Sequence, residues 1–161
     1  MNFTSRIFTL ALVLTATPAA AQFFYSPPPA LMGQPSYHLY SVAGAQASGA
    51  LETYFGCTNT TPANIRVGVE LFSGAGNIQN DPSASSLDVG PGASVVFGTS
   101  AAAWVALSSN LGASFTRGSA RILATEKKGI ICSAYLADPA NVPPTSMADL
   151  KVIAKTKQRG E

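Results

Sequence analysis

Two cysteines restrict the fold of this chain more than any other feature. Cys57 ends the run Leu51–Cys57, and Cys132 lies within Gly129–Leu136. Successive side chains of an extended strand point to opposite faces, and each cysteine shares a face with aliphatic or aromatic residues. The chain has no other cysteine, so we predict a Cys57–Cys132 disulfide in the core of a β-domain. Two buried, reduced thiols are the alternative.

The first 21 residues have the three-part layout of a secretory signal peptide. Arg6 supplies a positive charge, Ile7–Leu14 is almost wholly apolar, and small residues follow up to Ala21. We therefore predict cleavage between Ala21 and Gln22 and an exported protein, either periplasmic or secreted. An uncleaved anchor or a buried N-terminal helix is the alternative. Export favours the disulfide, and the mature chain has no apolar run long enough for a membrane span.

The mature chain has the length of one domain. Residues 22–35 form a proline-rich arm, in which three consecutive prolines favour an extended conformation. Residues 36–157 are predicted as the β-domain and 158–161 as a polar tail. The arm's aromatic side chains either pack on the domain or bind a partner. These aromatic residues are Phe23, Phe24 and Tyr25.

About eight short runs have the composition of β-strands and are separated by turn-forming residues. In Ile65–Leu71, for example, every second residue is aliphatic, whereas Glu70 falls on the other face. We predict an all-β fold, an antiparallel β-sandwich, with a small β-barrel as the alternative. Ala101–Leu107 fits either a short helix or a strand. The predicted strands are Ser36–Ala43, Leu51–Cys57, Ile65–Leu71, Ser85–Val89, Ala93–Phe97, Ser119–Thr125, Ile130–Leu136 and Leu150–Thr156.

The residues that carry chemistry are few. His38 is the only histidine, and no G-x-S-x-G motif accompanies it, so we predict no catalytic site. One histidine and two cysteines do not make a zinc site. Asn77, Asn80, Asp81 and Asp88 lack the EF-hand spacing and are interpreted as turn residues rather than calcium ligands. We predict no cofactor.

Two other groups of polar residues have simple interpretations. Glu52 and Glu70 are predicted to be solvated carboxylates on the outward faces of neighbouring strands. Asn59-Thr60-Thr61 matches the glycosylation sequon, which matters only in a host that uses it.

Only 11% of the residues are charged, and the formal net charge is +2, so we predict no nucleic-acid binding. A modest basic patch near the C-terminus comprises Lys151, Lys155, Lys157 and Arg159.

Four short segments resemble small exported bacterial proteins of uncharacterised function, which look like single β-sandwich domains with one cysteine pair. The resemblance implies the same fold and export, and it brings no catalytic or binding residue. The segments are Cys57-Thr-Asn-Thr-Thr, Val67-Gly-Val-Glu-Leu-Phe72, Gly118-Ser-Ala-Arg-Ile122 and Ile131-Cys-Ser-Ala134.

These observations predict a non-catalytic, exported β-sandwich that acts as a structural or protein-interaction module, with an unknown protein or cell-surface partner. Its binding surface would be the arm aromatics Phe23, Phe24 and Tyr25 or the loop that carries Trp104. The alternative is a small-molecule or carbohydrate binder in which Trp104 and nearby tyrosines stack on the ligand. A fully buried Trp104 would exclude that alternative.

Overall fold

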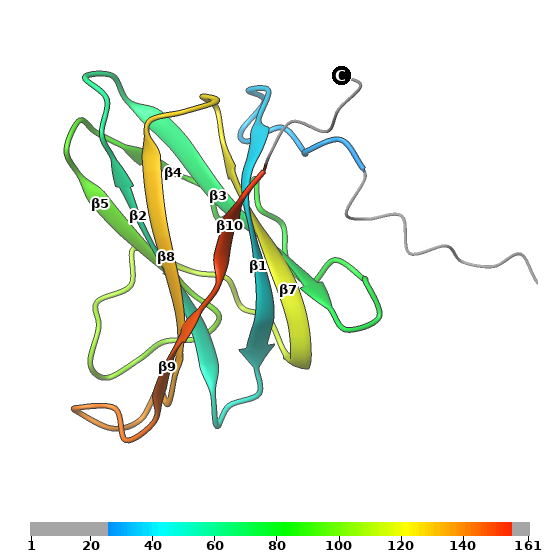
Figure 1. The fold of residues 1–161 in the computed structure, drawn as a ribbon, viewed down its shortest axis with the longest axis vertical. Coiled ribbons are helices and arrows are strands. Elements are labelled where there is room, and N and C mark those ends of the chain that lie inside the picture. The colour runs from blue at the N-terminus through cyan, green and yellow to red at the C-terminus, as the bar shows by residue number, and fades with distance from the viewer. Residues whose placement is uncertain (1–25, 156–161) are drawn as a thin grey trace, which may run out of the picture.

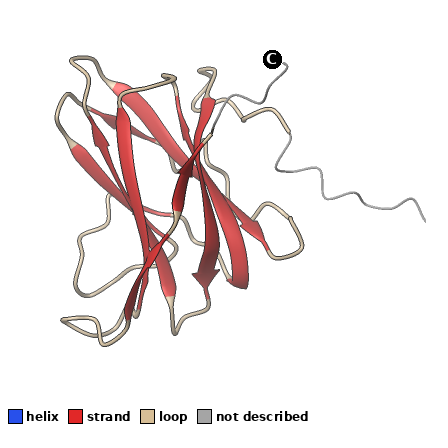
Figure 2. Ribbon diagram, viewed as in Figure 1, coloured by secondary structure: helices blue, strands red, loops and turns tan. Residues whose placement is uncertain are grey.

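The computed structural model describes residues 26–155, which form ten β-strands and no helix (Figures 1 and 2). The all-β prediction is therefore confirmed. The strands are β1 (Tyr37–Ala47), β2 (Glu52–Asn59), β3 (Ile65–Ser73), β4 (Leu87–Val89), β5 (Ser94–Gly98), β6 (Ser109–Asn110), β7 (Phe115–Ala124), β8 (Ile130–Ala137), β9 (Met147–Leu150) and β10 (Val152–Ala154).

The strands form two layers. In the first layer the order is β4-β3-β7-β1, with β10 on the free side of β1. In the second it is β6-β5-β2-β8-β9. The layers meet at two places. Ala47 of β1 pairs with Glu52 of β2, and the chain passes from β9, which pairs with β8, directly into β10, which pairs with β1. The fold is a sandwich nearly closed into a barrel along this side, and it is antiparallel except for the short parallel pair of β5 and β6 (Figure 1).

The core lies between the layers and is made by the predicted alternation. The inward residues of β3, from Ile65 to Leu71, are almost fully buried, and the inward residues of β7 and β2 meet them. Burial of such side chains stabilises the fold by roughly 1.5–3 kcal/mol each. The alternation of apolar and polar residues in the sequence therefore identifies the face of each strand that lies in the core.

Strands that are adjacent in sequence mostly lie in different layers. The segment from Leu51 to Ser73 forms β2 and β3, but the turn between them crosses from one layer to the other. The same holds for β4 and β5, and for β7 and β8, whose connection has hairpin length. The true neighbours of β2 are β5 and β8.

The segment Ala101–Leu107 is neither a helix nor a strand. It is a loop that crosses the outer face of the second layer. Ser108 anchors its end, because its N–H donates to Val96 O at 2.8 Å and its hydroxyl accepts from Val96 N at 3.0 Å. Leu107 packs where Gly98 has no side chain, since a Cβ there would lie 2.8 Å from Leu107 Cδ1.

The outer face of β3 and β7 is buried as well, which corrects the expectation that Glu70 is solvated. Glu70 of β3 and Arg121 of β7 form an ion pair whose side chains are both almost fully buried. Glu52 is also buried, but it lies in the other layer and does not approach Glu70. The described part of the arm, residues 26–35, covers the Glu70–Arg121 pair.

Candidate functional site

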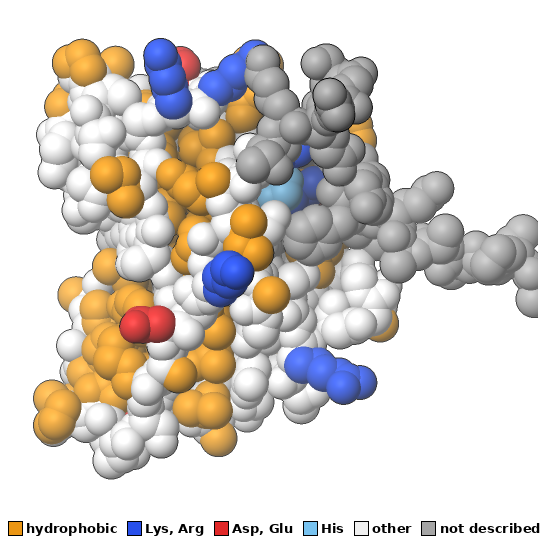
Figure 3. Space-filling model, viewed as in Figure 1, with side chains coloured by type: hydrophobic (Ala, Val, Ile, Leu, Met, Phe, Trp, Pro, Cys, Tyr) orange, Lys and Arg blue, Asp and Glu red, His pale blue; other side chains and the backbone are white. Residues whose placement is uncertain are grey.

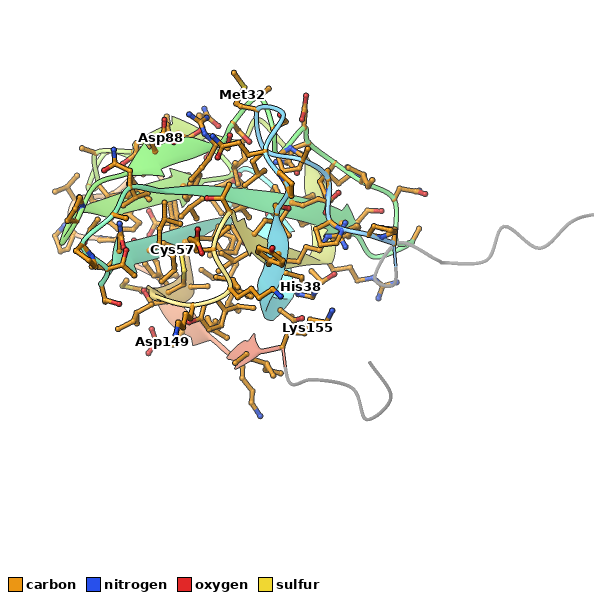
Figure 4. All side chains as sticks on the ribbon, turned by 90° about the horizontal axis from the view of Figure 1, so that it is seen from above. Met32, His38, Cys57, Asp88, Asp149 and Lys155 are labelled. Carbon is orange, nitrogen blue, oxygen red and sulfur yellow. A yellow bond between two sulfur atoms is a disulfide. The ribbon has the colours of Figure 1, made fainter. Side chains whose placement is uncertain are left out.

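Cys57 and Cys132 form the predicted disulfide. They lie directly opposite each other on β2 and β8, with their Cα atoms 4.2 Å apart. The bond therefore joins neighbouring strands of one layer and does not link the two layers. Cys57 points into the core, as Figure 4 shows, which places the disulfide in a structural position.

Several predicted site residues lie outside the described part of the chain. They are the cleavage pair Ala21 and Gln22 and the arm aromatics Phe23, Phe24 and Tyr25. The cleavage site and the aromatic part of the arm stay predictions.

Trp104 belongs to a cluster of three aromatic rings on the outer face of the second layer. Its ring lies 5.0 Å from Tyr54 and 5.8 Å from Tyr135, measured between centroids, and the two tyrosines stack at 5.7 Å. Tyr54 and Tyr135 are a cross-strand pair of β2 and β8. Burial raises the pKa of both tyrosines, so both hydroxyls are neutral at physiological pH. Trp104 itself is half-buried, which leaves part of its ring available.

Asp138 organises the loop beside this cluster. Its carboxylate accepts hydrogen bonds from the side chains of Thr145 and Asn141 and from the backbone N–H groups of Asn141, Thr145 and Ser146, at 2.6–3.1 Å. Burial acts to raise the pKa of Asp138, but these donors outweigh it and hold that pKa well below its usual range. The loop is therefore held by an ionised aspartate.

The Asp138 loop and the Trp104 loop are joined. Trp104 Nε1 donates to Asp138 O at 2.8 Å, and Ala103 N donates to Pro139 O at 2.9 Å. Two apolar side chains stand out from the end of the β8–β9 hairpin, Val142 at 69% and Met147 at 59% exposure. We call Trp104, Tyr135, Val142 and Met147 the aromatic end. Figure 3 shows apolar side chains gathered over the lower part of β8 and β9 in this view.

His38 lies on the outer face of the first layer, half-buried, beside Lys155 (Figure 4). Its Nε2 is 3.0 Å from both Tyr40 O and Ser41 Oγ. Burial lowers the pKa of His38 to about 4, and the positive charges of Arg121 and Lys155 act in the same direction. The imidazole is therefore neutral at pH 7.

The loop residues considered as calcium ligands have other partners. Asn80 accepts from Leu71 N and donates to Val69 O, both at 2.8 Å, so its amide takes the place of a neighbouring strand along β3. Asp81 accepts from Ser83 N at 2.8 Å as a turn residue, and Asp88 pairs with Arg66 on the neighbouring strand. Among residues 26–155, no group of three or more histidine, cysteine or acidic side chains is placed to hold a metal ion.

Asn59, the sequon asparagine, is fully buried. Its Nδ2 donates to Ala63 O at 2.7 Å and to Val89 O at 2.8 Å, and its Oδ1 accepts from Thr61 N at 2.9 Å. Both amide hydrogens are thus used inside the fold. Asn59 is a structural residue that ties the β2–β3 crossing to the edge strand β4.

Sequence reasoning singled out Trp104 but missed Asp138 and the Glu70–Arg121 pair. A signal for each was present. Asp138 is followed by asparagine, threonine and serine, the residues of a side-chain-anchored turn. In β3 and β7, the consecutive apolar pairs Leu71-Phe72 and Ile122-Leu123 indicate strands covered on both faces.

Comparison of the chain with protein-family models, with curated proteins and with solved structures finds no match. The resemblance to exported bacterial proteins therefore stays a prediction. Within residues 26–155, no helix is long and apolar enough to cross a membrane. The disulfide and this finding are compatible with an exported protein.

Proposed function

We propose that the protein is an exported, non-catalytic β-sandwich that binds a protein partner through the aromatic end. The observation that carries this proposal is the exposure of Val142 and Met147 on the hairpin whose Asp138 O accepts a hydrogen bond from the half-buried Trp104. Tryptophan, tyrosine and methionine are enriched at protein interfaces, and tryptophan and tyrosine often dominate the binding energy.

The rigidity of the surface supports the same proposal. The Asp138 carboxylate holds the loop that carries Val142, and Asp138 O holds the Trp104 ring. Apolar side chains on a preorganised loop lose little conformational entropy when a partner binds, so more of the contact energy appears as affinity.

A carbohydrate platform is the alternative, and the half-exposed Trp104 is compatible with it. Two features favour a protein partner instead. The Trp104 and Tyr135 rings are tilted by 47° and do not form one flat surface, and the indole N–H already bonds to Asp138 O. The neighbouring exposed residues, Val142 and Met147, offer no hydrogen bonds to sugar hydroxyl groups.

Site-specific photo-crosslinking tests the proposal. A photoreactive residue at Met147 is expected to capture a discrete partner when the protein is exported in its own host, and Trp104→Ala is expected to reduce that product. The matched control is Ile78, which is 44% exposed but lies on the loop after β3. The same product from both positions, or none from Met147, would contradict the proposal. A change in Trp104 fluorescence on adding oligosaccharides would favour the carbohydrate alternative.

A further inference from the structure

A strip on the outer surface of β3 and β7 is buried although it faces away from the core. Phe72 and Leu123 lie in this strip, together with the Glu70–Arg121 ion pair, and the arm covers it. Arg121 is only 1% exposed. Exposing this face to water would be costly because Phe72 and Leu123 are large and apolar, whereas covering it desolvates Arg121, which then needs the hydrogen bond that Ser26 O accepts.

The arm inserts one side chain into the strip. Leu31 has no exposed surface and packs against Gly68. A Cβ atom at position 68 would lie 2.9 Å from Leu31 Cδ2 and 3.0 Å from Pro82 O, so an alanine there forces Leu31 out of its place and crowds the Pro82 carbonyl. Gly68 therefore creates the recess that receives the leucine.

Polar groups beside the recess hold the backbone of the arm. Arg121 NH1 donates to Ser26 O at 2.9 Å, and Ser83 Oγ accepts from Met32 N at 2.9 Å. Glu70 fixes the guanidinium of Arg121. The strip and the neighbouring Ser83 loop thus present a donor, a leucine recess and an acceptor, in the same order along the arm as their partners Ser26, Leu31 and Met32.

The arm also has hydrogen bonds of its own. Leu31 and Gln34 exchange backbone hydrogen bonds of 2.9 and 3.0 Å around a tight turn in which Gly33 has φ +80°. Ser36 Oγ donates to Pro29 O at 2.6 Å, and the three prolines restrict the segment before the turn. Such a segment arrives preorganised, so a separate copy of it can make the same contacts.

We propose that this strip is a binding site for a linear, proline-rich segment, which the chain fills with its own arm and which also accepts the arm of a second copy. Exchange between copies loses no contact, since both arms have the same sequence. The chain's own arm has a high effective concentration, so the intact protein is expected to be a monomer at low concentration. The strip lies on the first layer, so this proposal does not depend on the aromatic end.

Two full-length variants test the exchange. Gly68→Ala fills the recess but keeps a normal arm, and Leu31→Ala keeps the recess but weakens the arm. Each is expected to be monomeric by itself, whereas their mixture is expected to form a one-to-one complex in native mass spectrometry. Gly56→Ala is the matched control, because a Cβ there meets only Ser133 Oγ at 3.3 Å, outside the strip. A mixture of Gly56→Ala with Leu31→Ala should stay monomeric.

A peptide measurement covers the case in which Gly68→Ala does not fold. A fluorescent peptide of sequence Ser26–Pro35 is expected to bind the full-length Leu31→Ala variant. The same peptide with alanine for Leu31 is expected to bind about 30-fold more weakly, because a buried leucine is lost. Equal binding of the two peptides, or no binding, would overturn the site. Peptide binding with a mixture that stays monomeric would overturn the exchange between copies.

Discussion

Asn59 illustrates how a sequence motif differs from the residue that carries it. The pattern Asn59-Thr60-Thr61 is that of a glycosylation sequon, yet the asparagine amide is buried and bonded at both ends. Thr61, the third residue of the motif, is one of its partners, because Thr61 Oγ1 donates to Asn59 Oδ1 at 2.8 Å. The motif here encodes a turn.

Replacing Asn59 by alanine is expected to lower the free energy of unfolding by about 2 kcal/mol, because the buried Val89 O loses its donor and the bond to Ala63 O is lost at the surface. Urea denaturation followed by Trp104 fluorescence measures this change. Asn64→Ala is the control: Asn64 is exposed and its substitution is expected to change stability by less than about 0.5 kcal/mol. Similar effects of the two substitutions would contradict the structural role of Asn59.

His38 makes a second residue-scale prediction, which concerns pH. Burial, Arg121 and Lys155 lower the pKa of the folded imidazole to about 4, whereas in the unfolded chain the imidazole takes up its proton near pH 6.5. The unfolded state therefore binds more protons between these values. The free energy of unfolding is expected to fall as the pH drops from 6.5 towards 4, and His38→Asn is expected to flatten that slope.

NMR measures the His38 titration directly, because the chain has one histidine and hence one imidazole signal. The expected midpoint is about 4 in the folded protein. A midpoint near 6.5 would mean that His38 is solvated and that the charges of Arg121 and Lys155 do not reach it.

At the scale of the elements, periodicity predicted strands well and their partners poorly. The alternation in β2, β3, β7 and β8 identified the core face of each strand, because alternation depends only on which side is buried. Pairing depends on where each turn directs the chain. The β2–β3 and β7–β8 connections have the composition of hairpin turns, and composition does not distinguish a hairpin from a crossing between layers.

The candidate site was predictable only in part, because its residues depend on partners that lie far away in the sequence. Trp104 is conspicuous as the single tryptophan, but its setting depends on Asp138, which lies 34 residues later in the chain. The buried pair of Glu70 and Arg121 depends on the arm, which lies 95 residues before Arg121 at their point of contact. Local patterns indicate a turn at Asp138 and strands covered on both faces at Glu70 and Arg121, but they do not identify the distant residues that make these contacts.

The Asp138 loop gives the element-scale prediction. Asp138→Asn keeps the shape of the side chain but replaces one acceptor oxygen by a donor, so Thr145 N and Ser146 N lose a shared acceptor. Amide hydrogen exchange at these two residues is expected to accelerate, with little change in the β2 strand. Asn141→Ala is a milder control, because the carboxylate keeps its other donors. Unchanged exchange in Asp138→Asn would contradict the anchoring role.

At the scale of the whole molecule, the disulfide constrains a long part of the chain. It joins residues 75 positions apart, so replacing both Cys57 and Cys132 by alanine is expected to cost about 4 kcal/mol, chiefly by freeing the unfolded state. Urea denaturation measures the loss. Full-length protein treated with reductant should lose stability by a similar amount. Equal free energies of unfolding for the oxidised and reduced forms would contradict this prediction, because the disulfide would then not stabilise the protein by restricting the unfolded state.

Most connections cross between the layers, and this has a consequence for how the chain folds. In a protein rich in hairpins, strands that are neighbours in sequence can pair first. Here β2 pairs along its length only with β5 and β8, which come later in the chain. Loop closure over such separations costs entropy before any contact offsets it, which is typical of slow-folding β-proteins. A chain kept unfolded until it is complete therefore loses few native contacts, because among the described strands β1 to β3 only Ala47 and Glu52 pair with each other.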